Sequence, residues 1–275
     1  MSERKGAAAA GLRSDDVREA TREGAATESA LERAGERVSA TPLRGFYERP
    51  EVPASSGQDR ARRQARMLTD VLRDVAAPAS IVDVGCGDGA ATILAAQVNP
   101  GHRIVGLDWS ADALRRARSR GLTLVRAEVE PTGLPIASGR ADVVIMSELI
   151  EHLVDPDSAL EEARRVLRPG GTLLLSTPNL AAWYNRGLLT LGVQPLFSEV
   201  SLRGVFGRPG TQVAGHLRLF TRRALVGLLA ARGFGSIQVS GASYHDVPRS
   251  LRPLDRAFCA WPAAASILLA RACRR

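Results

Sequence analysis

Short apolar runs alternate with amphipathic segments through the middle of this 275-residue chain. The runs are rich in Val, Ile and Leu at consecutive positions, which is typical of strands that are covered on both faces. The segments between them carry apolar residues at helical spacing. This alternation predicts an α/β fold, a doubly wound, Rossmann-like and mostly parallel sheet with helices on both faces. The expected strands are 80–85, 103–108, 122–127, 141–147, 172–177 and 235–240, and the expected helices are 90–98, 111–119, 157–167 and 221–232.

Three further segments complete this pattern. Apolar residues at helical spacing between Arg60 and Val75 predict a lead-in helix that helps to cover a ligand. Ala265–Ala272 is expected to return antiparallel as the last of seven strands. Gly170-Gly171 is expected to end the helix over 157–167, because glycine commonly follows the last helical residue.

The two ends of the pattern indicate the domain organisation. Residues 1–44 are rich in Ala, Glu, Arg, Ser and Gly and lack aromatics, so they cannot bury enough surface to offset their ordering entropy. We expect a disordered or partly helical tail there and one folded domain over 45–275. Residues 180–215 show no clear period, and so long an irregular connection is more often functional than idle. We expect 180–215 to be a substrate-lid insertion, with a peripheral structural insertion as the alternative.

A glycine-rich turn follows the first expected strand, with Gly85, Gly87 and Gly89 in the pattern G-x-G-x-G. Such a turn lets the backbone approach a ligand where any Cβ would block it. The next expected strand ends in Asp108, where an acid can bind ribose hydroxyls, so the pair predicts a nucleotide-binding βαβ unit. Gly85, Gly87 and Ala90 also fit the dinucleotide pattern, which keeps an NAD-dependent dehydrogenase as an alternative.

Two later motifs separate these alternatives. The pair Glu151-His152 follows the strand over 141–147, and an L-R-P-G-G turn over 167–171 precedes the next strand. In this order, and with the D-V-G-C-G-D-G turn over 83–89, the chain resembles the class I S-adenosylmethionine-dependent methyltransferases. The E-x-x-E-H pattern is similar to that of the ubiquinone-biosynthesis O-methyltransferase branch and of small-RNA 2′-O-methyltransferases.

The resemblance implies a site for S-adenosylmethionine as cofactor. The glycine turn and the acid before it would line the methionine end, and the acid after the second strand would hold the ribose. Glu128 stands where the family usually has Asp. The implied cofactor residues are Asp83, Gly85 and Gly87 at the methionine end, Asp108 at the ribose, Trp109 and Glu128 at the adenine, and Ser147 near the cofactor.

Methyl transfer from a sulfonium is an in-line displacement, so the protein mainly aligns the reactants. A neutral hydroxyl acceptor must also lose its proton, to a general base or with the help of a metal. Glu148, Glu151 and His152 stand at i, i+3 and i+4, which share one face of a helical turn. They predict a divalent Mg or Mn site, which by the resemblance His216 would complete. Alternatively His152 and Glu151 act as the catalytic base without a metal, or His152 only holds a loop.

Four residues after the fifth central strand are candidates for contact with the acceptor: Asn179, Trp183, Tyr184 and Asn185. The T-P-N motif over 177–179 with a later histidine recurs in methyltransferases of ribose, quinone and glycan hydroxyls. By this resemblance, the expected reaction is O-methylation of a small-molecule, quinone or glycan hydroxyl. The alternatives are an RNA-modifying 2′-O-methyltransferase and a non-catalytic, cofactor-binding partner module.

Composition and charge bear on the partners. The net charge is +8, Lys5 is the only lysine, and residues 201–275 hold twelve arginines. A basic surface can attract nucleic acid, anionic lipid headgroups or phosphorylated substrates, although it can also be merely solvated. The apolar segment Ala257–Ala272 is too short to span a bilayer, so it is expected to be a buried strand with its preceding loop, with peripheral membrane contact as the alternative. Three scattered cysteines and the absence of an apolar core in the first thirty residues favour a cytoplasmic location.

Overall fold

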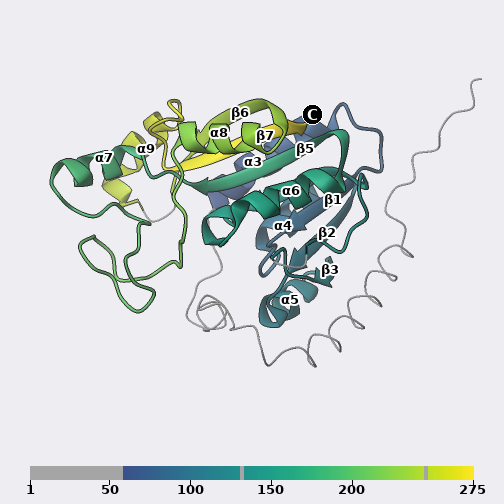
Figure 1. Ribbon diagram of the computed structural model, residues 1–275, viewed down its shortest axis with the longest axis horizontal. Coiled ribbons are helices and arrows are strands. Elements are labelled where there is room, and N and C mark those ends of the chain that lie inside the picture. Colours follow the sequence, from purple (N-terminus) through teal and green to yellow (C-terminus); the bar gives the residue numbers. More distant parts are fainter. Residues whose placement is uncertain (1–57, 131–132, 245–246) are drawn as a thin grey trace, which may run out of the picture.

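A seven-stranded sheet forms the centre of the protein in the computed structural model, which describes residues 58–130, 133–244 and 247–275 (Figure 1). The strand order is β3-β2-β1-β4-β5-β7-β6. The first five strands in this order pair parallel, and β7 pairs antiparallel with both β5 and β6. The sheet therefore confirms the predicted doubly wound fold with an antiparallel last strand. The strands are β1 (Ser80–Val84), β2 (Arg103–Asp108), β3 (Thr123–Arg126), β4 (Ala141–Ser147), β5 (Leu167–Pro178), β6 (Phe234–Ala242) and β7 (Ile267–Arg274).

Helices cover both faces of this sheet. The covering helices are α3 (Gln58–Leu72), α4 (Ala90–Val98), α5 (Ala111–Arg118), α6 (Pro156–Val166) and α8 (Arg222–Ala231). Helices α7 (Trp183–Thr190) and α9 (Arg252–Phe258) lie beyond one end of the sheet (Figure 1), and there are 3-10 turns η1 (Ile150–His152) and η2 (Arg249–Leu251). The predicted tail over 1–44 and the predicted domain start at 45 lie outside the described residues.

The strand β4 shows why its sequence is apolar at consecutive positions. Val143 and Ile145 pack into a cluster with residues of α3 and α4, whereas Val144 and Met146 pack into a second cluster with residues of α6 and α8. Successive side chains of a strand point to opposite faces, so a strand between two helical layers needs apolar residues on both.

Three helices begin at side-chain caps that the sequence provides. Ser110 accepts a hydrogen bond from the backbone N–H of Ala113 at the start of α5. Asp155 does the same for Ser158 in α6, and Thr221 does so for the third residue of α8. Each cap satisfies a backbone donor that the first helical turn leaves without a partner.

The glycine pair at 170–171 does not end a helix as predicted. Helix α6 ends at Val166, and the extended residue Leu167 already pairs with Ala141 as the first residue of β5. Gly170, with a left-handed φ of 73°, lies where the pairing between β4 and β5 shifts register. The glycine therefore permits an irregularity inside a strand, because only glycine adopts this conformation without strain.

The region after β5 contains a helix that the sequence pattern did not predict. Helix α7 has no side-chain cap and includes Gly187, so its local signals are weak. Tertiary contacts hold it instead, because the Trp183 ring stacks on Phe258 of α9 with centroids 5.6 Å apart. The backbone N–H of Trp183 also donates to the carbonyl of Ala264.

The last strand lies where the sequence pattern placed it, with a small shift in its bounds. β7 runs between β5 and β6, and its residues from Ile267 to Ala270 are buried. The apolar end of Ala257–Ala272 is therefore core. Among the described helices, none has the length and apolar character that a bilayer crossing requires.

Candidate cofactor and acceptor site

The carboxylate of Asp108 holds the glycine turn at the carboxyl ends of β1 and β2. Its Oδ2 accepts a hydrogen bond from the backbone N–H of Gly87 at 2.8 Å, and its Oδ1 accepts one from Ser110 at 2.9 Å. Burial raises the pKa of Asp108 above its ordinary value, while these backbone donors oppose the rise. The predicted ribose acid therefore also fixes the predicted cofactor loop.

The glycines of this turn have left-handed φ values, 74° at Gly85, 55° at Gly87 and 75° at Gly89. A Cβ on Gly85 would lie 2.9 Å from a methyl carbon of Leu149, and one on Gly89 would lie 2.5 Å from Leu122. A Cβ on Gly87 would meet nothing within 4 Å. A side chain at Gly85 or Gly89 would displace a leucine side chain, whereas Gly87 borders open space in which a ligand can approach the backbone.

A small pocket lies beside this turn, between α3, α4 and the ends of β1 and β4. Asp83, Gln64 and Ser147 are among its lining residues. Ser147 donates to Gln64 Oε1 at 2.7 Å, and Thr92 donates to Asp83 Oδ2 at 2.6 Å. Asp83 Oδ1 and Gln64 Nε2 are buried and have no hydrogen-bond partner among the described residues. Buried polar atoms normally have partners, so this acceptor and this donor are available to a ligand.

The environment of Asp83 makes its carboxyl group easier to protonate than an exposed one. Burial raises its pKa to about 6, and the hydrogen bond from Thr92 and the charge of Arg60 oppose this rise. A positively charged ligand group would reverse the effect of burial, because an opposite charge stabilises the carboxylate. The methionine end of S-adenosylmethionine carries such a charge, so Asp83 fits the implied cofactor.

The two residues predicted at the adenine lie at the same edge of the sheet. Trp109 directly follows β2, and its carbonyl accepts a hydrogen bond from Arg126 at 3.1 Å. Glu128 follows β3 by two residues, next to Ala127, whose N–H donates to the carbonyl of Asp108. The structure thus gathers all seven predicted cofactor residues at the ends of four neighbouring strands, and their contacts with a cofactor stay predictions.

Residues 58–239 match the family described as methyltransferase domain. The chain belongs to this family. The matched span contains the glycine turn, the pocket and the Glu151-His152 pair, so the family assignment covers the whole candidate site. S-adenosylmethionine is the methyl donor that the family implies.

Individual relatives support the same family at modest identity. The malonyl-[acyl-carrier protein] O-methyltransferase of Geobacter sulfurreducens is 31% identical over 208 residues, covering 71% of this chain and 72% of that protein. The ubiquinone biosynthesis O-methyltransferase of Methylococcus capsulatus is 38% identical over 103 residues, covering 36% of this chain and 43% of that protein. Other curated relatives are matched over only 35% to 53% of their own length.

Solved structures show the fold of this methyltransferase domain. A Thermotoga maritima structure described as a S-adenosylmethionine-dependent methyltransferase, possible histamine N-methyltransferase, superposes with a TM-score of 0.54 at 16% identity, covering 80% of this chain and 91% of that one. At this identity the likeness extends to the fold alone.

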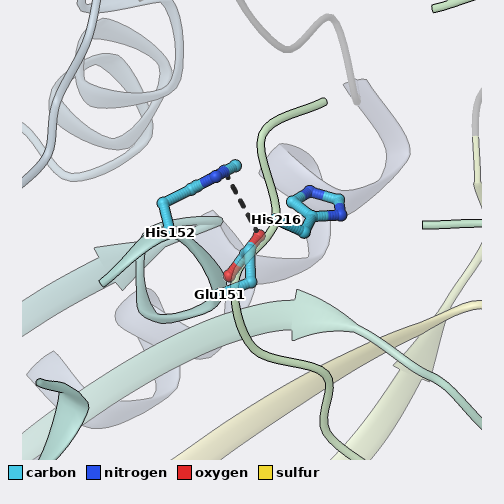
Figure 2. A group of neighbouring side chains, drawn as sticks. All are labelled: Glu151, His152 and His216. Atoms are coloured by element: carbon cyan, nitrogen blue, oxygen red, sulfur yellow. Dashed lines mark ion pairs between the residues drawn. The ribbon is translucent and has the colours of Figure 1, made fainter. Parts of the chain in front are cut away.

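A second cluster of chemically active side chains lies at the ends of β4 and β5, and Figure 2 shows its three members, Glu151, His152 and His216. One ligand atom from each residue lies within 4.8 Å of the others. Glu151 and His152 belong to η1, whereas His216 comes from the segment between α7 and α8. Nε2 of His152 lies 3.9 Å from Oε1 of Glu151, and the two imidazole centroids are 4.8 Å apart.

Backbone carbonyls set the tautomers of both imidazoles. Nδ1 of His152 lies 3.2 Å from the carbonyl oxygen of Gly215, and Nδ1 of His216 lies 3.2 Å from that of Phe197. A carbonyl oxygen only accepts hydrogen bonds, so each Nδ1 carries the proton and each Nε2 is the basic nitrogen. Burial lowers the pKa of His152 to about 3 and that of His216 to about 4, so both rings are neutral at neutral pH.

Glu151 is the buried acid of the cluster. Its Oε2 accepts a hydrogen bond from the Thr177 hydroxyl at 3.0 Å, and its Oε1 has no hydrogen-bond partner among the described residues. Burial, followed by the neighbouring charge of Glu148, raises the pKa of Glu151 well above its ordinary value. A bound cation would lower this pKa, because it favours the carboxylate.

These three residues fit a divalent transition metal. Metal-binding histidines typically donate their other ring N–H to a backbone carbonyl, as both rings do here. Two imidazole nitrogens with one carboxylate oxygen suit manganese, iron or zinc better than magnesium, which prefers oxygen ligands.

Glu148, the fourth predicted metal ligand, lies outside this group. The predicted helical face does not form, because Glu148 has a left-handed φ of 50° and the turn η1 begins only at Ile150. Its Oε1 lies 3.9 Å from Nε of Arg60.

The four predicted acceptor residues have internal contacts. Asn179 and Asn185 are fully buried, and the Asn179 amide donates to the carbonyl of Ala265 at 2.8 Å. The carbonyl of the Asn185 side chain accepts from Leu196 at 2.8 Å. These bonds hold the first part of the predicted lid.

The two aromatic candidates, Trp183 and Tyr184, lie at the start of α7. Trp183 donates through its indole N–H to Asp255 at 3.0 Å. Burial raises the pKa of the Tyr184 hydroxyl, so this group stays protonated. Contact of all four residues with an acceptor stays a prediction.

Glu199, which none of the sequence patterns indicated, orders the segment that carries His216. The side chain of Glu199 is 2% exposed and pairs with Arg208 at 3.2 Å. Its carboxylate also accepts hydrogen bonds from the backbone N–H groups of Ala214, Gly215 and His216. One sequence signal could have identified it, because Glu199 is the only acidic residue between Glu162 and Asp246.

Proposed function

We propose that this protein transfers the methyl group of S-adenosylmethionine to an oxygen atom of a small-molecule, quinone or glycan hydroxyl. The cluster of Glu151, His152 and His216 carries this proposal. A hydroxyl must lose its proton to become a good nucleophile, and this cluster supplies groups that can assist the loss. Both named relatives above are O-methyltransferases, which supports the same acceptor atom.

The chain's own residues would bind and align the reactants. When bound, S-adenosylmethionine supplies an electrophilic methyl group. Asp108 and the glycine turn would hold the adenosyl part, and Asp83 would face the charged methionine end beside Ser147. Ser147, which lines the donor pocket, is the last residue of β4, and the turn with Glu151 follows this strand. Alignment of this kind can lower the barrier by about 7 to 11 kcal/mol at best.

We further propose that Glu151, His152 and His216 hold a divalent transition-metal ion. Such an ion would lower the pKa of an acceptor hydroxyl. Action of His152 alone as general base is less favourable, since a pKa of about 3 makes its imidazole a weak base at neutral pH. By contrast, because Nδ1 carries the proton in both histidines, both Nε2 atoms are unprotonated, which is the form that a metal binds.

Calorimetric titration of chelator-treated protein with manganese and with zinc tests the metal proposal. We expect binding of one ion per chain, and at least about tenfold weaker binding in His216→Ala. The matched control His102→Ala changes a histidine that caps the start of β1 and should bind the ion like the wild type. Binding of S-adenosylhomocysteine to each variant shows that the fold is intact. Equal metal binding by His216→Ala and wild type would contradict this assignment.

Product analysis tests the reaction itself. The protein is incubated with S-adenosylmethionine carrying an isotope-labelled methyl group and with catechols, quinols and glycans, and the product is located by NMR. We expect a methyl ether. A product methylated at nitrogen or carbon would contradict the proposed acceptor atom.

A further inference from the structure

Exposed apolar side chains concentrate in one region of the molecule. We call residues 183–220 and 247–261 the α7–α9 lobe, which extends from one end of the sheet in Figure 1. Within the described chain, the lobe holds eight of the ten large apolar side chains that are exposed. The eight are Leu189, Leu191, Val200, Phe206, Leu217, Leu251, Leu254 and Trp261.

The two helices of the lobe are packed together, so their exposed residues belong to one body. Trp183 of α7 stacks on Phe258 of α9, and its indole N–H bonds to Asp255. The Arg186 guanidinium lies 5.8 Å from the ring centroid of Trp261 and donates to the carbonyl of Ala263.

The exposed charge of the lobe is positive. Glu199 and Asp255 are its only acidic side chains among the described residues, and both are buried with hydrogen-bond donors around them. Exposed arginines of the lobe are Arg186, Arg203, Arg218, Arg249, Arg252 and Arg256. The solvent-facing surface of the lobe is therefore apolar and positively charged. Among the described residues of the lobe, no acidic side chain is exposed.

We infer that the α7–α9 lobe docks on the surface of an anionic lipid bilayer. Apolar side chains such as Leu191 and Phe206 would enter the boundary between headgroups and acyl chains, while arginines bind the anionic headgroups. The same combination fits nucleic acid less well, because backbone phosphates bind arginines but do not bind exposed leucines. The inference is independent of the acceptor atom proposed above, since it rests on the lobe's surface alone.

Flotation of the full chain with vesicles tests this inference. Vesicles of phosphatidylcholine with phosphatidylglycerol should bind the protein, and vesicles of phosphatidylcholine alone should bind it at least about tenfold more weakly. Binding to the anionic vesicles should weaken as salt is raised, because salt screens the arginines.

Two lobe variants separate the apolar contribution from the charge. We expect Leu191→Ser with Phe206→Ser, and separately Arg252→Gln with Arg256→Gln, each to weaken binding at least about tenfold. The matched controls change exposed residues of the same kinds outside the lobe, Val98→Ser with Val154→Ser and Arg115→Gln with Arg118→Gln, and should bind like the wild type. All these side chains are exposed, so S-adenosylhomocysteine binding should be unchanged and reports that each variant is folded.

Three outcomes would overturn the inference. The first is absence of binding to anionic vesicles at low salt, and the second is an equal loss of binding in lobe and control variants. The third is a different occupant of the lobe. Binding of single-stranded RNA that the arginine variant loses and the apolar variant keeps would assign the surface to nucleic acid. A wild-type dimer in sedimentation that the apolar variant converts to a monomer would assign it to a second copy of the chain.

Discussion

Glu199 accepts a hydrogen bond from the backbone N–H of His216, with 2.9 Å between the nitrogen and Oε2. The same oxygen accepts one from Gly215 at 2.7 Å, and the carbonyl of Gly215 in turn orients the imidazole of His152. One buried carboxylate therefore positions both histidines of the candidate site.

Replacement of Glu199 by Gln should weaken both the fold and the reaction. The amide would turn donors toward the backbone N–H groups and leave Arg208 without its charged partner, and breaking a buried ion pair costs about 3 to 5 kcal/mol. Chemical denaturation should show a loss of about this size, and turnover should fall at least about tenfold as the histidines shift. S-adenosylhomocysteine should bind as before, because the residues that Glu199 contacts, Arg208 and 214–216, do not line the cofactor pocket. The control Glu161→Gln removes an acid that is 59% exposed and should lose less than about 1 kcal/mol. Equal stability of the two variants would show that Glu199 does not hold this segment.

Replacement of Asp108 by Ala should nearly abolish cofactor binding. The change removes the implied ribose acceptor and releases the N–H of Gly87, and hydrogen bonds to a charged group contribute about 1.5 to 3 kcal/mol each. We expect calorimetry to show at least about 100-fold weaker binding of S-adenosylhomocysteine. Asp112→Ala, on the neighbouring helix and 51% exposed, is the control and should bind normally. Unchanged affinity in folded Asp108→Ala protein would mean that the cofactor lies elsewhere.

Replacement of Gly87 by Ala should separate backbone strain from contact with the ligand. Gly87 and Gly121 both have left-handed φ values, 55° and 77°, and a Cβ on either would meet nothing within 4 Å. Each alanine substitution should therefore lower the free energy of unfolding by a similar amount, roughly 1 to 2 kcal/mol, in thermal or chemical denaturation. Only Gly87→Ala should also weaken S-adenosylhomocysteine binding, because its methyl group would enter the cofactor's space. If calorimetry gave the same S-adenosylhomocysteine affinity for both variants, it would argue against a ligand over Gly87.

The affinity for the cofactor should fall in acid through Asp83. Its pKa of about 6 means that the free protein binds a proton there below this pH, whereas the charged methionine end favours the carboxylate. Binding then releases a proton, so affinity should drop about tenfold for each pH unit below 6. Calorimetry in two buffers of different ionisation enthalpy measures the released proton directly. Arg60 and Asp108, the neighbouring charged groups, are still present in Asp83→Asn, so only the part of the pH dependence that Asp83 causes should disappear. A flat profile in the wild type would refute the link.

The same shift predicts the sign of the stability change with pH. The folded pKa of Asp83 lies above the ordinary value of 3.8, so the folded state binds the proton more tightly than the unfolded chain does. Its protonation therefore stabilises the fold at low pH, and this contribution is lost as pH rises through about 6. Added S-adenosylhomocysteine should restore stability above that pH by mass action. Thermal unfolding of wild type and Asp83→Asn between pH 5 and 8 checks this, and parallel curves for the two proteins would count against it.

The sequence by itself determined the sheet, the order of its central strands and helices along the chain, and the residues at the carboxyl ends of the strands. Val143 to Met146 are apolar at consecutive positions because both faces of β4 are covered, and Gly85, Gly87 and Gly89 adopt left-handed conformations. Signals of this kind are local, since they depend on the period of a strand or the conformational freedom of one residue.

Only the tertiary structure decided how the second cluster is assembled. His216 lies 64 positions after His152 in a segment without a period, and the buried carboxylate of Glu199 fixes its place. The left-handed φ of Glu148 likewise removes that residue from a group that sequence spacing suggested. Helix α7 forms for a similar reason, because its stability comes from Trp183 packing on Phe258 rather than from its own residues. Contacts between residues so far apart in the chain produce no periodic pattern in the sequence. They can therefore be identified only from the folded structure.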